Sequence, residues 1–433
     1  MLEKKVDVNE RLPLLQSIPL SLQHLFAMFG ATVLVPYLVG LDTSVTLFTS
    51  GVGTLLYILI TKGKIPAYLG SSFAFIAAMT AIIGSVAGQP GDPSKIALAM
   101  GGCAIVGIIY IIVAIAIAIF GINWINYLLP PVVIGSVVIV IGLGLAGAAV
   151  NMAMGNIWLA LAALAIAIFA AAFFKGFLGV IPVLIGIIGG YLVALFTGNV
   201  HFNTVMTAKY FAVPGFIFPK FSWAAIIAIA PIALVVITEH IGHLIVTNNI
   251  IGRDFMKDPG LHRSLTGDGV ATALAGFLGG PPNTTYGENI GVMAITRVFS
   301  VWVIGGAAVI AIILSFIPKI GAFIQTIPVP VMGGICILLF GIIASQGIRM
   351  LVEAGIDFSQ KRNLIIASVI LVIGIGGAKI DIAGIEFSGM PLATYIGIIL
   401  NIVIPRSKDL EKVDDNQTTQ KQVASGVTGE SGK

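Results

Sequence analysis

Apolar segments, each long enough to cross a lipid bilayer, follow one another along almost the whole 433-residue chain. Hydrophobic residues make up 58% of the sequence and charged residues 10%, and the mean hydropathy is +1.05. About a quarter of the residues of a soluble protein are charged. The sequence therefore predicts an all-α, multi-pass protein of the lipid bilayer, and its net charge of +4 gives no reason to expect nucleic acid as a partner.

A helical span needs roughly 20 residues at 1.5 Å each, and this length predicts fourteen spans. The expected spans are residues 15–39, 44–61, 66–86, 95–120, 124–147, 156–174, 177–197, 223–250, 262–279, 282–297, 299–318, 322–347, 361–378 and 388–405. Because fourteen is an even number, both ends of the chain should lie on one side of the membrane.

The distribution of Lys and Arg indicates which side that is. With the N-terminus inside, 18 of the 23 Lys and Arg residues fall at inside positions, as the positive-inside rule requires. Both termini are therefore expected in the cytoplasm, including the segment 1–14. The tail 406–433 is too polar to bury a core and is expected to be disordered. The loop 198–221 is the longest on the outside, and we expect it to fold over the surface.

A polar stretch, Pro281–Gly291, stands where the tenth span is expected. A charged side chain at the bilayer centre costs roughly 2.5–3.5 kcal/mol on insertion scales, and two adjacent prolines cannot continue a helix. Irregular backbone survives at this depth only when it is buried in protein or lines a cavity. The stretch therefore predicts a binding site built from a broken helix.

Short matches between the two halves of the chain indicate an internal repeat. The matches join Gly70–Ala74 with Asn283–Gly287, Pro130–Gly135 with Pro328–Gly333, and Gln23–His24 with Glu239–His240. All three are seven spans apart, and because seven is odd the second half would be inverted. We expect the broken spans 3 and 10 to meet near the midplane through short extended segments.

Among the acidic residues, only Glu239 and Glu288 lie deep within expected spans, whereas Asp268 is placed near a helix end. An ionisable group inside the membrane suggests a functional site. Glu239 and His243 are four residues apart on one helix face and form a candidate proton-binding pair. Zinc would need further ligands, so we expect no metal. His240 alone is more typical of a packed histidine.

Gly287 and Glu288 would begin the second part of the broken span, where backbone N–H groups are free to donate. The Glu288 carboxylate adds an acceptor. Donors beside acceptors suit a planar ligand that carries both C=O and N–H groups, and Phe73 could stack on its face. Ordinary packing is the alternative for Phe73. A simple anion does not fit, because two carboxylates would repel it.

The run Glu288–Arg297 resembles the signature of the nucleobase-ascorbate transporter family: an acidic or amide residue, Asn, any residue, Gly, four further residues, Thr and a basic residue. Gln23–His24 is similar to a second motif of that family. The runs Pro19–Gly30, Lys62–Phe75 and Pro282–Arg297 most resemble its bacterial members that transport uracil. The resemblance extends to about residue 405.

This resemblance implies two inverted seven-span repeats that form a core domain and a gate domain in the bacterial inner membrane. The core would comprise residues 15–120 and 223–320, and the gate residues 121–222 and 321–405. It also implies uracil import by proton symport with alternating access, no cofactor other than the proton, and no enzymatic activity. The oligomeric state stays open between a monomer and a homodimer.

Carried over to this chain, the resemblance implies that Glu239 and Glu288 hydrogen-bond the base, the Gly287 backbone assists, Phe73 lines the pocket and His243 takes part in proton coupling. We expect support from Gln23, His24, Tyr286, Asn289 and Thr296. A purine or xanthine permease and a sodium-coupled transporter are the alternatives within the same class. An intramembrane enzyme or a channel is the alternative outside it.

Overall fold

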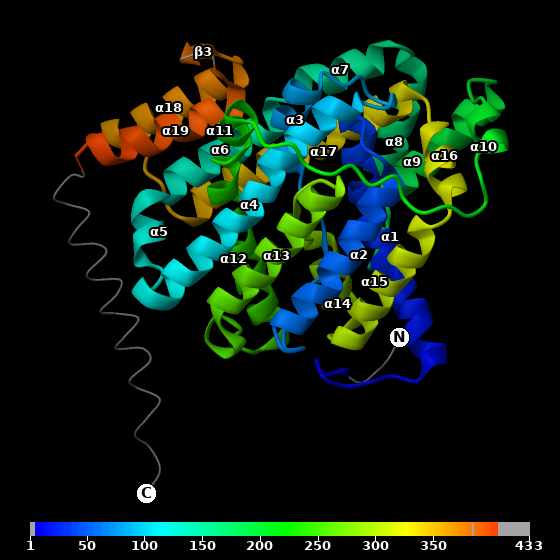
Figure 1. Cartoon of the computed structure of the whole chain (residues 1–433), viewed down its shortest axis with the longest axis horizontal. Helices are drawn as coiled ribbons and strands as arrows, with labels where there is room; N and C mark the ends of the chain where they lie inside the picture. The colour runs from blue at the N-terminus through cyan, green and yellow to red at the C-terminus, as the bar shows by residue number, and fades with distance from the viewer. Residues whose placement is uncertain (1–4, 383–384, 406–433) are drawn as a thin grey trace, which may run out of the picture.

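The computed structural model describes residues 5–382 and 385–405, and within them it is almost entirely helical (Figure 1). The tail that was expected to be disordered, residues 406–433, lies outside the described residues, as do residues 1–4. The described part confirms an all-helical protein with several apolar spans.

Each of the fourteen expected spans contains a helix. The first half comprises α1 (Leu14–Val39), α2 (Thr43–Ile60), β1 (Leu69–Ser71), η1 (Phe73–Phe75), α3 (Ile76–Ile83), α4 (Pro93–Phe120), α5 (Asn123–Leu128), α6 (Pro131–Leu143), α7 (Ala146–Met154), α8 (Ile157–Phe173), η2 (Gly176–Gly179), α9 (Pro182–Phe196) and α10 (Asn203–Thr207). The second half comprises α11 (Trp223–Ile229), α12 (Ile232–Ile251), η3 (Met256–Gly260), α13 (Leu261–Leu278), β2 (Asn283–Thr285), α14 (Gly287–Thr296), α15 (Val301–Ser315), α16 (Pro318–Gln325), α17 (Val329–Glu353), α18 (Lys361–Ile375), β3 (Lys379–Ile382), β4 (Ile385–Ser388) and α19 (Gly389–Val403).

Six helical stretches of the described chain are long and apolar enough to cross a bilayer, and the bent pair α15–α16 would add a seventh. The remaining expected spans contain shorter or broken helices, except for the ninth, whose helix α13 has 18 residues but is more polar. Proline sets several of the breaks: Pro131 opens α6, and Pro330 lies in the first turn of α17. A residue without an N–H group is tolerated there, because the first turn of a helix has no partner for that group. The expected spans 5 and 12 therefore begin later than the sequence suggested.

The two broken spans meet through their extended segments. Strand β1 pairs with β2 in antiparallel register, with Leu69 opposite Thr285, Gly70 opposite Thr284 and Ser71 opposite Asn283. This arrangement confirms the expectation that spans 3 and 10 contact each other through extended backbone. The pair lies among α1, α2, α12 and α13, where Ser50 Oγ of α2 donates to Leu69 O and Thr272 Oγ1 of α13 accepts from Asn283 N.

The helices pack in a pattern that repeats between the two halves. The contact of α4 with α13 corresponds to the contact of α15 with α2. In the same way, the pair α8–α9 corresponds to α18–α19, and the pair α17–α8 corresponds to α6–α18. Small residues allow the closest crossings. An added Cβ at Gly107 would lie 2.3 Å from the backbone nitrogen of Ala273, and one at Gly142 would lie 2.3 Å from the carbonyl oxygen of Phe340. Such close approach of backbones is how helices associate in lipid.

The long loop expected to fold over the surface does so. Its backbone hydrogen-bonds to the ends of three helices: Ala212 N donates to Phe316 O, Ile217 N to Leu278 O, and Lys220 N to Ala97 O. Figure 1 shows this segment crossing the upper face of the helices in the view. The loop thus closes over one end of α4, α13 and α15.

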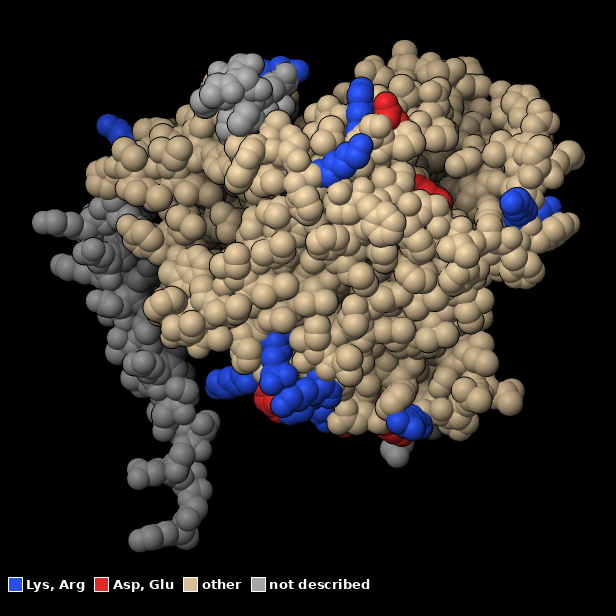
Figure 2. All heavy atoms as spheres, in the orientation of Figure 1, with Lys and Arg blue, Asp and Glu red and all other residues tan. Residues whose placement is uncertain are grey.

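Charged side chains are concentrated at the two ends of the helices, and a broad tan band between them is almost free of charge (Figure 2). Many Lys and Arg side chains gather at the lower end in the view, where α2 ends and α13 begins. The band between the ends is the part of the surface suited to lipid.

Candidate functional site

A cavity of about 260 Å³ lies where the broken spans meet α1, α12 and α17. Its size is close to the lower end of small-molecule sites, roughly 300 Å³. The walls bring together all four residues that the sequence assigned to substrate binding, and also the proposed proton-coupling histidine: Phe73, Glu239, His243, Gly287 and Glu288. These residues come from η1, α12 and α14, which are far apart in the sequence.

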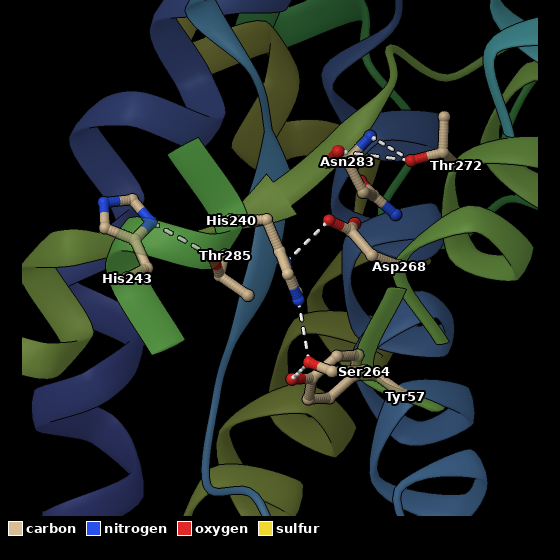
Figure 3. A network of polar contacts seen from close by, with 8 residues as sticks. All are labelled: Tyr57, His240, His243, Ser264, Asp268, Thr272, Asn283 and Thr285. Atoms are coloured by element: carbon tan, nitrogen blue, oxygen red, sulfur yellow. Dashed lines mark hydrogen bonds and ion pairs between the residues drawn. The ribbon is translucent and has the colours of Figure 1, made fainter. Parts of the chain in front are cut away.

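Helix α12 carries Glu239 and His243 on the face towards the cavity, as their spacing of four residues predicted. Both side chains are only partly buried, so they remain open to the cavity. His243 Nδ1 shares a hydrogen bond of 3.0 Å with Thr285 Oγ1 of β2, as Figure 3 shows. Its other ring nitrogen, Nε2, lies 3.4 Å from where a Cβ on Gly287 would be. The imidazole is therefore held against the start of α14.

Helix α14 begins at Gly287 with Tyr286 as its N-cap residue and Glu288 in its first turn. The Tyr286 hydroxyl donates to the carbonyl oxygen of Ser71 at 3.0 Å and lies 3.2 Å from Thr32 Oγ1. Its ring fills the space that a side chain on Gly70 would need, since a Cβ there would lie 2.5 Å from the ring. Tyr286 therefore locks the two extended segments together and fixes where α14 starts.

Four of the expected supporting residues do not line the cavity. His24 and Asn289 are buried together: the Asn289 amide nitrogen lies 3.1 Å from His24 Nδ1 and donates to the His24 carbonyl oxygen. Thr296 donates to the carbonyl oxygen of Val292, near the end of α14. Gln23 lies on α1, outside the cavity walls. The contact between His24 and Asn289 joins α1 to α14 and so holds α14 in position without reaching the cavity.

The other wall of the cavity was not recognised in the sequence. It consists of residues 180–184 before and at the start of α9, together with Leu339, Ile342, Ile343 and Gln346 of α17. Two neighbouring threonines of β2 also line the cavity, and the buried Thr284 Oγ1 has no hydrogen-bond partner among the described residues. The apolar wall residues resemble any lipid-facing residues in sequence, so no local signal distinguishes them.

The structure corrects the expectation for Asp268, which is not near the edge of its span but fully buried in α13. Its Oδ2 lies 3.0 Å from His240 Nδ1, at ion-pair distance but outside the angular range of a hydrogen bond. His240 Nε2 contacts Ser264 Oγ at 2.7 Å, and Ser264 Oγ contacts the Tyr57 hydroxyl at 2.7 Å (Figure 3). His240 is thus the packed histidine that the sequence favoured, with a partner that the sequence missed.

The arrangement offers donors and acceptors to one planar ligand. The N-terminal turn of α14 presents backbone N–H groups, Glu239 and Glu288 present acceptors, and Thr284 presents a hydroxyl. Phe73 offers a ring for stacking from the opposite segment. Glu239 and Glu288 both line the cavity, so two carboxylates would repel an anion there. The cavity therefore favours a neutral, flat molecule over an anion.

Comparison with known proteins agrees with this geometry. Residues 15–382 match the model of a family described as the permease family. The chain is 53% identical over 440 residues to the uracil permease of Bacillus subtilis strain 168, covering 96% of this chain and 99% of that one. It is 48% identical over 414 residues to the uracil permease of Escherichia coli strain K12, covering 93% and 94%.

Two solved structures of other transporters show a similar fold. The transmembrane domain of the cyanobacterial bicarbonate transporter BicA matches with a TM-score of 0.61 at 14% identity, over 91% of this chain and 99% of that domain. The structure of SLC26A9 matches with a TM-score of 0.66 at 12% identity, over 90% of this chain and 64% of that one. At such low identity these likenesses concern the fold alone.

Proposed function

This chain belongs to the permease family that its residues 15–382 match, and on that premise we propose that it is a secondary transporter that imports uracil together with protons. The resemblance to nucleobase transporters is confirmed, and the family is one of transporters rather than enzymes. The relatives of about 50% identity over more than nine tenths of the chain are named as uracil permeases.

The observation that carries the proposal is the cavity in which Glu239, Glu288 and the first turn of α14 converge opposite Phe73. Uracil is neutral at pH 7 and carries both N–H donors and carbonyl acceptors on a flat ring. Its N–H groups match the two carboxylates, its carbonyl oxygens match the N–H groups of α14, and its face matches the Phe73 ring. A site built to hydrogen-bond a ligand in this way strongly rejects analogues that lack those groups.

We further propose that the fold consists of fourteen spans in two inverted repeats of seven. The paired packing of the helices supports this, because exchanging each span for the one seven places away reproduces the three pairs of contacts described above. The strand register supports it as well. The repeat aligns Gly70 with Asn283 and Ser71 with Thr284. When this alignment is applied to both members of the observed pair Gly70–Thr284, it gives Asn283–Ser71, which is the neighbouring pair in the observed register.

Alternating access would follow from movement between two groups of helices. The proposed core, α1–α4 with α11–α15, holds every polar residue of the cavity except Gln346, whereas the proposed gate contributes its apolar wall from α9 and α17. Motion of the core past this wall would expose the site to one side and then to the other. In a homodimer, each copy would make this movement between its own core and its own gate.

We place both termini in the cytoplasm of a bacterial cell. The Lys and Arg residues at the lower end in Figure 2, where α2 ends and α13 begins, support this orientation under the positive-inside rule. Inward movement of one proton releases about 2.3 kcal/mol per 100 mV. At 1.36 kcal/mol per tenfold, this supports about fifty-fold accumulation of uracil. Protonation of Glu239 and His243 from outside would couple the two fluxes.

Uptake of radiolabelled uracil into proteoliposomes tests the proposal, with unlabelled bases as competitors and with and without a protonophore. We expect uracil to compete fully, xanthine and adenine to compete poorly, and the protonophore to abolish accumulation. Accumulation that follows a sodium gradient and ignores the protonophore would refute proton coupling. Stronger competition by xanthine would identify a purine permease instead.

A further inference from the structure

A chain of buried polar groups lies between α12, α13 and α2, apart from the walls of the substrate cavity. It contains Asp268, His240, Ser264 and Tyr57, whose side chains come from α13, α12 and α2. All four are almost completely buried, and none lines the cavity. Figure 3 shows them in a row, with the His240 ring between the Asp268 carboxylate and the Ser264 hydroxyl. The substrate site described above uses none of them.

The contacts in this row favour one shared proton. A single carboxylate sealed away from water is costly, because burial penalises an uncompensated charge. Asp268 Oδ2 lies 3.0 Å from His240 Nδ1, and no Lys or Arg is paired with this carboxylate among the described residues. One proton shared by the aspartate and the imidazole makes the pair neutral overall. In this conformation the Asp268–His240 pair therefore binds one proton more than an ionised aspartate and a neutral histidine hold together.

Helix α12 joins this pair to the cavity. Glu239, which lines the cavity, directly precedes His240 in α12. Tyr110 of α4 is buried against Gly269, the residue after Asp268, and its hydroxyl has no hydrogen-bond partner among the described residues. The titratable groups that face the pair are thus Glu239, Tyr110 and Tyr57, with His243 one helical turn along the same helix. A proton held at Asp268 would relieve the repulsion on Glu239.

The other end of the row points towards the proposed cytoplasmic side. Ser264 is in the first turn of α13, and Tyr57 is in the last turn of α2, where the chain reaches the basic lower end of the molecule. Each contact between them is 2.7 Å, short enough for a hydrogen bond between hydroxyls or to an imidazole nitrogen. A hydroxyl donates one proton and accepts another, so it can pass a proton on without keeping a charge.

We propose that His240 and Asp268 form a second proton-binding site, and that Ser264 and Tyr57 carry the proton from it to the cytoplasm. During release, the His240 Nε2–H bond breaks as Ser264 Oγ gains that proton. Ser264 passes its own proton to Tyr57, and Tyr57, which is buried in this conformation, passes its proton to a water admitted at the ends of α2 and α13 when the protein opens to the cytoplasm. The imidazole loses one proton and water gains one. The inference rests on the proposed proton symport and adds the inward path to it.

The test compares net accumulation with exchange in the same proteoliposomes. Exchange of internal for external labelled uracil needs the substrate site and the moving core but no net proton release. In His240→Gln, the amide can still bond to both Ser264 and Asp268 but binds no proton. We expect its exchange rate to stay within twofold of the unmodified protein. Accumulation driven by an imposed potential of 100 mV, about fifty-fold for the unmodified protein, should fall to about onefold.

A second variant distinguishes loss of the proton path from a general packing defect. Tyr57→Phe keeps the ring that lies against Gly267 and removes only the hydroxyl at the end of the row. We expect net uptake at least tenfold slower with exchange unchanged. The matched control is His262→Gln, an exposed histidine on the same helix α13, which should change neither rate.

The outcomes separate the inference from the proposed function. Full accumulation in both His240→Gln and Tyr57→Phe would overturn the inference while leaving proton symport intact. Parallel loss of exchange and accumulation in both variants would also overturn it, because the row would then be a purely structural support. Accumulation by the unmodified protein without any proton uptake would refute the proposed symport and, with it, the path described above.

Discussion

Replacement of Glu288 by Gln should weaken uracil binding by about a hundredfold or more. The carboxylate lies in the first turn of α14 and lines the cavity. In the variant, the amide oxygen would turn towards the free backbone N–H groups of that turn, because only an oxygen can accept from them. The amide NH₂ would then face an N–H group of uracil, so that a donor meets a donor.

The magnitude follows from two terms. A hydrogen bond to a charged group contributes roughly 1.5–3 kcal/mol, and leaving a buried donor without a partner costs roughly 1–3 kcal/mol. Together they give about 2.5–6 kcal/mol, and each 1.4 kcal/mol changes the dissociation constant tenfold. The expected loss is therefore about 10²- to 10⁴-fold. The volume of the side chain hardly changes, so packing contributes little.

Isothermal titration of uracil into the purified variant measures this loss directly. Glu353→Gln is the matched control, since Glu353 is exposed and its ion pair within the described part of the chain is with Arg349 on the same helix. It should bind uracil like the unmodified protein. If Glu288→Gln has the same thermal stability and the same uracil affinity as the unmodified protein, then Glu288 does not accept a hydrogen bond from the base and the assignment of the site is wrong.

Three further substitutions test other parts of the site. Glu239→Gln should remove uracil-driven proton uptake, measured as alkalinisation outside vesicles, and uptake at the original stoichiometry would place the proton elsewhere. Thr285→Val removes the 3.0 Å hydrogen bond to His243 and should lower proton-coupled uptake severalfold, whereas unchanged uptake would show that this bond does not orient the imidazole. Gly70→Ala places a Cβ 2.5 Å from the Tyr286 ring and should cost about 1–3 kcal/mol, seen as a lower melting temperature.

Gly242→Ala is the control for the glycine substitution. Gly242 is exposed on α12, and an added Cβ there would meet nothing within 4 Å. Its melting temperature should stay the same or rise slightly, since alanine favours a helix more than glycine does. An equal loss of stability in the two glycine variants would mean that the contact between Gly70 and Tyr286 is not the cause.

Polar residues in apolar surroundings were the part of the site that could be read from the sequence. Glu239, Glu288 and the stretch Pro281–Gly291 stand out because a linear hydropathy pattern exposes any group that lipid would reject. The helical period placed Glu239 and His243 on one face, and both do line the cavity. The matched segments around Gly70 and Asn283 also predicted that the broken spans would meet, as β1 and β2 do.

Partners that depend on distant parts of the chain were decided by the tertiary structure. Asp268 seemed to lie near a helix end, because its neighbours Gly267 and Gly269 give no sign of depth, and only the packing of α13 against α2 and α12 buries it beside His240. Leu339 and Ile343 of α17 look like any lipid-facing residues, yet they form the cavity wall. Hydropathy records whether a residue avoids water, not which surface it meets, and that surface is created by the crossing of helices.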